Sequence, residues 1–171
     1  MVLHFAVTAV LFLFCVAVIY GAISDVTTYT IPNWVSYGIA MLFFVFAALT
    51  WARTPILVDL GFGLLTFVIC VVFWRLKWLG GGDVKFVSAV ALWMGPEQIL
   101  LFTVLLAGLS AIFVAILQYA KQWNAYIQQS GFTPGFIKQM VQKAEEHACP
   151  YGLPAAIAAL VVVPDIVARS Q

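Results

Sequence analysis

Long apolar runs without charge constrain this chain more than any other feature of its sequence. Residues 2–23, 34–52, 60–74 and 99–117 contain no lysine, arginine, aspartate or glutamate. The hydrocarbon core of a bilayer is about 30 Å thick, and roughly 20 helical residues cross it. Because the runs approach or reach that length, we expect an all-α, polytopic integral membrane protein.

The composition supports this expectation. Only 9% of the residues are charged, whereas a soluble domain carries roughly 25%. The formal net charge of +1 gives no reason to expect a nucleic-acid partner. Cys15, Cys70 and Cys149 lie far apart and form no CxxC pair. We therefore interpret them as small apolar packing residues rather than as zinc ligands or a disulfide framework.

Breaks containing proline and glycine divide the chain into about six transmembrane helices. We place them at residues 2–23, 33–51, 56–75, 83–95, 97–119 and 152–168. An even number of helices puts both termini on one side of the membrane. With the termini outside, the cytoplasmic side holds most basic residues, as the positive-inside tendency requires. Those residues are Arg75, Lys77, Lys85, Lys121, Lys138 and Lys143, against Arg53 and Arg169 outside.

The most polar stretch, residues 118–150, is expected to be a cytoplasmic loop of a single membrane-embedded domain that covers residues 1–171. Within it, Thr133-Pro134 has the pattern of a helix N-terminus. Apolar residues then recur at helical spacing: Phe136, Ile137, Met140, Val141 and Ala144. This pattern predicts a short helix that lies in the membrane interface or covers a groove over the site, and both interpretations stay open.

The acidic residues are few enough to be considered one by one. Five have ordinary explanations: Glu145 and Glu146 in solvent, Asp59 and Glu97 near helix starts, and Asp165 at the interface. An acid near a helix start is favoured by the helix dipole. Two others differ, because Asp25 ends the first charge-free run and Asp83 follows the three glycines Gly80–Gly82.

The apolar segment after Asp83 is too short to cross a bilayer. Val84–Gly95 would form a helix of roughly 18 Å, against a hydrocarbon core of about 30 Å. Asp83 is therefore expected below the membrane surface, where a carboxylate is costly unless it is paired, hydrated or neutralised. Irregular backbone, which we expect at Gly80–Gly82, is tolerated there only where protein covers it or water reaches it.

Two such carboxylates together have the chemistry of an aspartic protease. They share one proton, because like charges in contact cannot both ionise easily. The ionised member then takes a proton from water while the protonated member polarises the scissile carbonyl, without a metal, cofactor or nucleophilic side chain. The glycines would let an extended substrate backbone approach closely. A plainer interpretation stays open: Asp83 as a helix cap, the glycines as a hinge and Asp25 as an interfacial residue.

Three elements resemble the type IV prepilin peptidases and preflagellin peptidases. Gly80-Gly81-Gly82-Asp83-Val84-Lys85 resembles their GxGD motif. Asp25 followed by Ile31-Pro32-Asn33 resembles their first aspartate and its Ile-Pro-Asn element, and Pro150-Tyr151-Gly152 resembles their C-terminal segment. The three elements occur in the family's order. The small size resembles the branch that serves tight-adherence (Flp-type) pili.

The resemblance implies that Asp25 and Asp83 are a catalytic pair. It implies removal of a short basic leader from prepilin-like precursors at the cytoplasmic face of the bacterial inner membrane. We group Gly80, Gly81, Gly82, Lys85 and Asn33 as substrate-binding residues. The chain has no inserted domain with paired cysteines between its first two helices, so methyl transfer is not expected.

Several alternatives stay open at this stage. Lys85 could tune Asp83 or only extend toward the interface, and Asn33 could hold the loop of Asp25 or cap the second helix. Val26–Thr30 lacks the basic residues that often follow the first aspartate in the family. The whole chain could also be a small proton- or ion-coupled transporter, or a non-catalytic assembly subunit of a pilus or secretion system.

Overall fold

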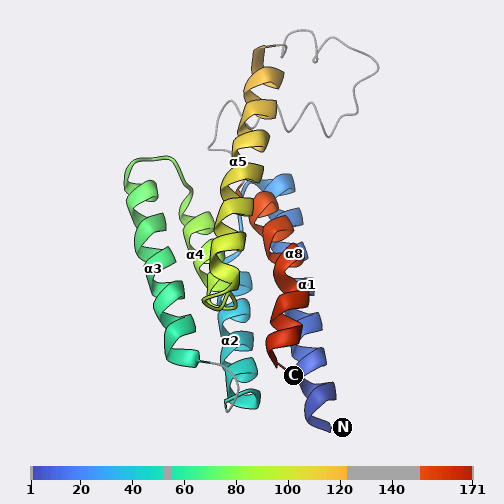
Figure 1. Ribbon diagram of the computed structural model, residues 1–171. Helices are drawn as coiled ribbons and strands as arrows, with labels where there is room; N and C mark the ends of the chain where they lie inside the picture. Colours follow the sequence, from blue (N-terminus) through green and yellow to red (C-terminus); the bar gives the residue numbers. More distant parts are fainter. Residues whose placement is uncertain (1, 52–54, 123–150, 171) are drawn as a thin grey trace.

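The computed structural model describes residues 2–51, 55–122 and 151–170. The described residues form six helices and no strand (Figure 1). The helices are α1 (Val2–Thr28), α2 (Asn33–Leu49), α3 (Ile56–Arg75), α4 (Gly81–Ala91), α5 (Gln98–Gln122) and α8 (Gly152–Ser170). The prediction of an all-α fold is confirmed.

The helices have the lengths and composition of a membrane protein. By both measures α1, α3, α5 and α8 can cross a bilayer, and α2 is a shorter apolar helix. Large apolar side chains are exposed on the outer faces of the bundle, among them Phe5, Phe12, Leu57, Leu64 and Leu100. Since a bilayer rather than water surrounds such faces, the expected polytopic membrane protein is confirmed.

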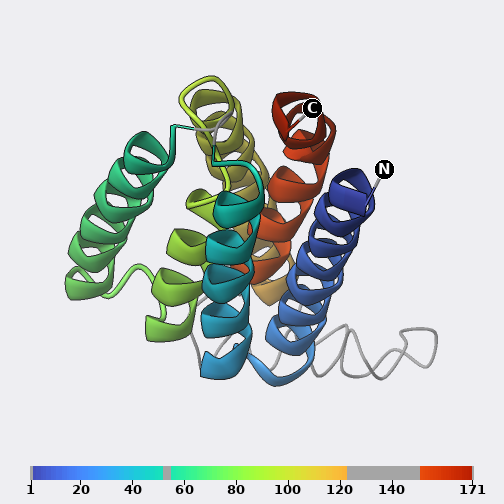
Figure 2. The same ribbon diagram turned by 90° about the horizontal axis from the view of Figure 1, so that it is seen from below.

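The short helix α4 lies at the centre of the bundle. It packs against α2, α3 and α8, while α1 packs against α2 and α8, and α5 packs against α8. Figure 2 shows α3 at the edge of the bundle, beside α4. With only 11 residues, α4 is about 16 Å long, so it cannot cross a bilayer by itself. Both termini lie at one end of the bundle (Figure 1), as expected for an even number of helices.

Trp93, just beyond the C-terminal end of α4, fixes this helix against α1 and α2. Its fully buried ring stacks on Phe14 at a centroid distance of 4.2 Å and contacts Phe46 at 5.2 Å. Its Nε1–H donates a 3.1 Å hydrogen bond to the backbone carbonyl of Ile39. The indole thus fills the core while its one polar group is satisfied.

Two helix boundaries differ from the sequence-based expectation in ways that affect the candidate site. Helix α1 continues to Thr28, so Asp25 lies inside its last turns rather than beyond its end. Helix α4 begins at Gly81, and only Gly80 is extended, with φ −74° and ψ 152°. The expectation of irregular backbone was therefore wrong for Gly81 and Gly82. Gly81 and Gly82 are instead the first two residues of the helix, where the backbone N–H groups have no partner within it.

The boundaries of α5 also differ. It begins at Gln98, so Glu97 precedes the helix instead of lying in its first turn, and it continues to Gln122, beyond the expected start of the polar loop. Residues 123–150, with the helix expected over residues 136–144, lie outside the described part of the chain.

Asp59 has a partner that its sequence position did not indicate. It lies in the first turn of α3 as expected, but its side chain is only 1% exposed, and it forms a 3.0 Å ion pair with Arg169. Arg169 also donates a 3.3 Å hydrogen bond to the backbone carbonyl of Trp93. The first turn of α3 is thereby joined to the last turn of α8 at the end of the bundle that holds the termini.

Candidate active site

Asp25 is supplied by α1 and held by the start of α8. Its side chain is only 3% exposed, and its Oδ2 accepts a 2.7 Å hydrogen bond from the backbone N–H of Gly152. Gly152 is the first residue of α8, and the first N–H groups of a helix have no partner within it. The N-terminus of a helix also favours a negative charge. The carboxylate thus occupies a position that an anion prefers.

Asp83 is supplied by the first turn of α4. It is 7% exposed, and its Oδ2 accepts a 3.1 Å hydrogen bond from the backbone N–H of Gly80. This contact is one half of a capping box, in which the third helical residue binds back to the cap. The residue at the cap itself is Gly80, so the interpretation of Asp83 as the N-cap was wrong in position. The contact fixes the carboxylate at the start of α4.

The fold brings these two carboxylates together. They come from different helices, Asp25 from the last turns of α1 and Asp83 from the first turn of α4, and both are buried at the same end of the bundle. The nearby contact between Gly21 and Phe86 explains why α1 and α4 can approach. Gly21 lies one turn before Asp25, and a methyl group there would lie only 2.5 Å from Cε2 of Phe86. We refer to Asp25 and Asp83 as the aspartate pair, and to the end of the bundle that holds them as the aspartate end.

Lys85 and Asn33 connect α4 to α2 at the aspartate end. The Nζ of Lys85 donates a 2.8 Å hydrogen bond to Oδ1 of Asn33. Pro32 occupies the N-cap position of α2 without a side-chain cap hydrogen bond, so the interpretation of Asn33 as a helix cap was wrong. Instead, Asn33 joins the Ile-Pro-Asn element to the turn of Lys85. Ile31 also lies against Gly82, where a Cβ would be 3.5 Å from the Ile31 backbone nitrogen.

The turn after Asp25 is held by its own polar groups. The Oγ of Ser24 donates a 2.9 Å hydrogen bond to the backbone carbonyl of Thr30, and the backbone N–H of Tyr29 donates a 2.8 Å bond to the carbonyl of Asp25. Tyr29 adopts a φ of 56°, in the left-handed region. The polar residues of this turn thus define its shape, which is a structural role for a segment that lacks basic side chains.

Glycines mark the places where backbone approaches the aspartate pair. A Cβ on Gly152 would lie 2.7 Å from Oδ2 and 2.9 Å from Cβ of Asp25, and one on Gly80 would lie 3.0 Å from Oδ2 of Asp83. Gly81 is exposed, and its nearest neighbour would be Nε1 of Trp74 at 3.8 Å. The sequence indicated Gly152 only as part of a family element. Nothing in the sequence pointed to Gly21 or Phe86.

The comparison with known families bears on this arrangement. A model of the type IV leader peptidase family matches residues 12–116, more than half of the chain. The chain belongs to this family. The matched segment includes both members of the aspartate pair, whereas α8 with Gly152 lies beyond it. Membership in the family implies aspartic peptidase activity in general. No curated protein and no solved structure matches the chain.

Proposed function

We propose that this chain is a membrane aspartyl endopeptidase of the GxGD type with Asp25 and Asp83 as its catalytic residues. Its substrates would be prepilin-like precursors of Flp-type pili, from which it removes a short basic leader. The observation that carries the proposal is the convergence of two buried carboxylates, from α1 and from α4, at one end of the bundle. Two neighbouring carboxylates that share a proton are the arrangement that aspartic proteases use.

The proposed reaction uses one proton shared by the aspartate pair. The ionised carboxylate takes a proton from a water molecule, whose oxygen attacks the scissile carbonyl, while the protonated carboxyl donates to the carbonyl oxygen. The resulting tetrahedral intermediate collapses when the leaving amine receives a proton from the pair and the C–N bond breaks. The backbone N–H of Gly152 holds Oδ2 of Asp25, and the backbone N–H of Gly80 holds Oδ2 of Asp83. Such fixed positions lower the cost of aligning the reacting groups.

Several residues around the pair would contact the substrate. Gly80, which is extended, and the neighbouring Gly81 and Gly82 would lie against the substrate backbone, since none of them carries a side chain. Lys85 and Asn33 are both exposed and bonded to each other, and they would line the approach to the pair.

The distribution of basic residues supports an orientation in the bacterial inner membrane in which the aspartate end faces the cytoplasm. Arg75, Lys77 and Lys85 lie exposed at this end, and Lys121 lies at the end of α5. At the opposite end of the described structure, Arg169 is paired with Asp59. Basic residues accumulate on the cytoplasmic side of membrane proteins.

The experiment is cleavage of a co-expressed precursor by variants of the aspartate pair. Asp25→Asn and Asp83→Asn should each lower cleavage by at least about 10²-fold, because acid–base catalysis supplies roughly 10²–10⁴-fold. Both variants should still insert into the membrane. Asp165→Asn is the matched control, because Asp165 is exposed and lies in α8 toward the opposite end.

Normal processing by either variant of the pair would refute the protease mechanism. Loss of proton or ion flux in these variants, with processing intact, would indicate the transporter. If neither precursor processing nor ion flux changes in these variants, the chain is an assembly subunit that needs the helices but not the carboxylates.

A further inference from the structure

An apolar groove separates α3 from α5. Its volume is about 590 Å³, and it stays open because α3 packs against α4 whereas α5 packs against α8. Ile69 and Phe73 line it from α3, Leu106 and Ala111 line it from α5, and Val87 of α4 lies between them. In Figure 2, α3 stands at the edge of the bundle, so the groove opens toward the surrounding bilayer.

The groove leads to the aspartate pair. Leu79, which lines it, directly precedes Gly80, and Tyr151, which also lines it, directly precedes Gly152. These two glycines are the residues that hold the carboxylates. One end of the groove therefore lies beside the candidate active site.

The packing around the groove suits a peptide helix better than a lipid chain. The two helices that flank the groove pack against other partners, α3 against α4 and α5 against α8, so a helix can lie between them. Ala107 and Ala111, one turn apart on α5, also line the groove. Small residues at such positions let a second helix approach closely.

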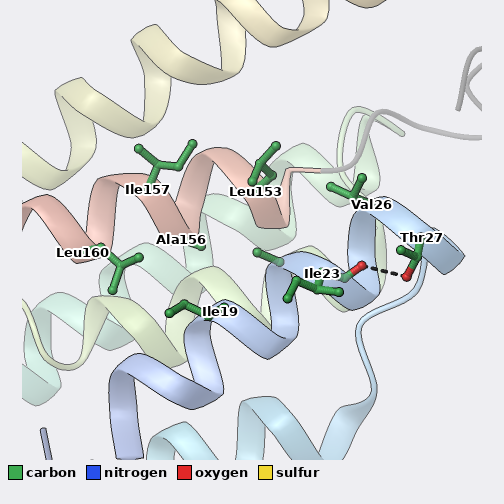
Figure 3. A pocket seen from close by; sticks show the side chains of 9 residues that line it. Ile19, Ile23, Val26, Thr27, Leu153, Ala156, Ile157 and Leu160 are labelled. Carbon is green, nitrogen blue, oxygen red and sulfur yellow. Dashed lines mark hydrogen bonds between the residues drawn. The ribbon is translucent and has the colours of Figure 1, made fainter. Parts of the chain in front are cut away.

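A second groove lies between α1 and α8 (Figure 3) and also reaches residues beside the candidate site, Val26 and Leu153. It is smaller, about 340 Å³, and its lining includes Ile19, Ile23, Ile157 and Leu160. Since α1 and α8 pack directly against each other, a helix could not enter between them. Its hydroxyl group, that of Thr27, donates a 2.7 Å hydrogen bond to the carbonyl of Ile23. This surface suits lipid chains.

We propose that the groove between α3 and α5 binds the apolar membrane helix that follows the cleavage site of the precursor. The start of that helix lies at the aspartate end, which places the scissile bond at the aspartate pair and leaves the leader outside the membrane. The inference rests on the proposed function and adds the site where the membrane-embedded part of the substrate is held.

The first test narrows the groove. Its probe is a model precursor with a short basic leader ending in glycine, followed by an apolar helix of about 20 residues. Ala111→Trp should raise the KM for this precursor about tenfold. The indole would occupy space that the precursor helix needs, and such overpacking costs on the order of 1–3 kcal/mol of binding free energy. Ala115→Trp is the matched control, because Ala115 is exposed on the same helix one turn further on and does not line the groove. Equal KM values for the two variants would overturn the inference.

The second test detects the bound helix directly. A photo-cross-linking amino acid is placed at position 111, 115 or 157 of the full chain carrying Asp83→Asn, which keeps the precursor uncleaved. The expected result is a precursor adduct from position 111 at least about fivefold stronger than from the other two, because cross-linking requires contact at the distance of packed side chains. Stronger adducts from position 157, or equal adducts from all three positions, would overturn the inference.

The two proposals can fail separately. If the unmodified protein does not cleave the model precursor, the proposed function fails. If it cleaves the precursor but position 111 forms no specific adduct, only the assignment of the groove fails.

Discussion

The backbone N–H of Gly152 donates a 2.7 Å hydrogen bond to Oδ2 of Asp25, across 127 positions of sequence. The bond joins the first residue of α8 to one of the last turns of α1. It makes α8 part of the candidate site, although the family match ends at residue 116. The site is therefore assembled from both ends of the chain around the central helix α4.

Gly152→Ala should impair cleavage without preventing folding. The added methyl group would lie 2.7 Å from Oδ2 and 3.0 Å from Cγ of Asp25, so the carboxylate has to move. We expect kcat to fall about 10- to 100-fold, since a displacement of about 1 Å can cost 10²-fold. Gly38→Ala is the control, because a Cβ there meets nothing within 4 Å. A wild-type rate for Gly152→Ala in a cleavage assay would contradict the importance of this contact.

Gly21→Ala should destabilise the protein through Phe86. A methyl group at residue 21 would lie 2.5 Å from Cε2 of Phe86, and this ring is fully buried. We expect the free energy of unfolding in detergent to fall by about 1–3 kcal/mol, the usual cost of overpacking. Phe86→Leu in the same chain removes the clashing ring atom, so the double variant should lose less than the sum of the single losses. If the loss of unfolding free energy in the double variant equals the sum of the two single losses, residues 21 and 86 are not in steric contact.

Variants of Lys85 and Asn33 show whether Lys85 acts through its hydrogen bond to Asn33 or acts directly on Asp83 or the substrate. Lys85→Met and Asn33→Leu remove the same 2.8 Å hydrogen bond, so each should lower cleavage by a similar factor of about two- to tenfold, as for one bond of about 0.5–1.5 kcal/mol. The double variant should be no worse than either single variant, because the two residues share one interaction. A loss with Lys85→Met alone would mean that this lysine acts directly on Asp83 or on the substrate.

Asp59→Asn should reduce stability and leave the chemistry intact. The substitution removes the negative partner of Arg169, whose side chain is only 13% exposed, and an unpaired buried charge costs about 3–5 kcal/mol. Replacing both residues, Asp59→Leu with Arg169→Met, should recover part of the loss because no unpaired charge remains. The measurements are unfolding in mixed micelles and kcat of the folded fraction. A fall in kcat at full stability would contradict a purely structural role.

The membrane character was predictable from the sequence, and the same sequence singled out Asp25 and Asp83, whose side chains are buried. Charge-free runs indicate membrane helices, because charge in a hydrocarbon core is costly wherever the helices later pack. Asp25 and Asp83 stood out because acids are few and because one of them follows three glycines. The helix boundaries were less predictable. The turns around Asp25 and Gly81 are helical, because tertiary contacts hold residues that local preference leaves open.

The amino-acid sequence by itself determined an all-helical membrane protein with two unusual carboxylates. Only the tertiary structure decided that Gly152 binds Asp25 and that Gly21 lies against Phe86. The same holds for Asp59, an acid near a helix start in the sequence, which forms a buried ion pair with Arg169. The periodicity and composition of a segment indicate which of its residues face lipid, water or the protein core. Contacts between residues more than a hundred positions apart depend on how whole helices pack, and no local pattern encodes that packing.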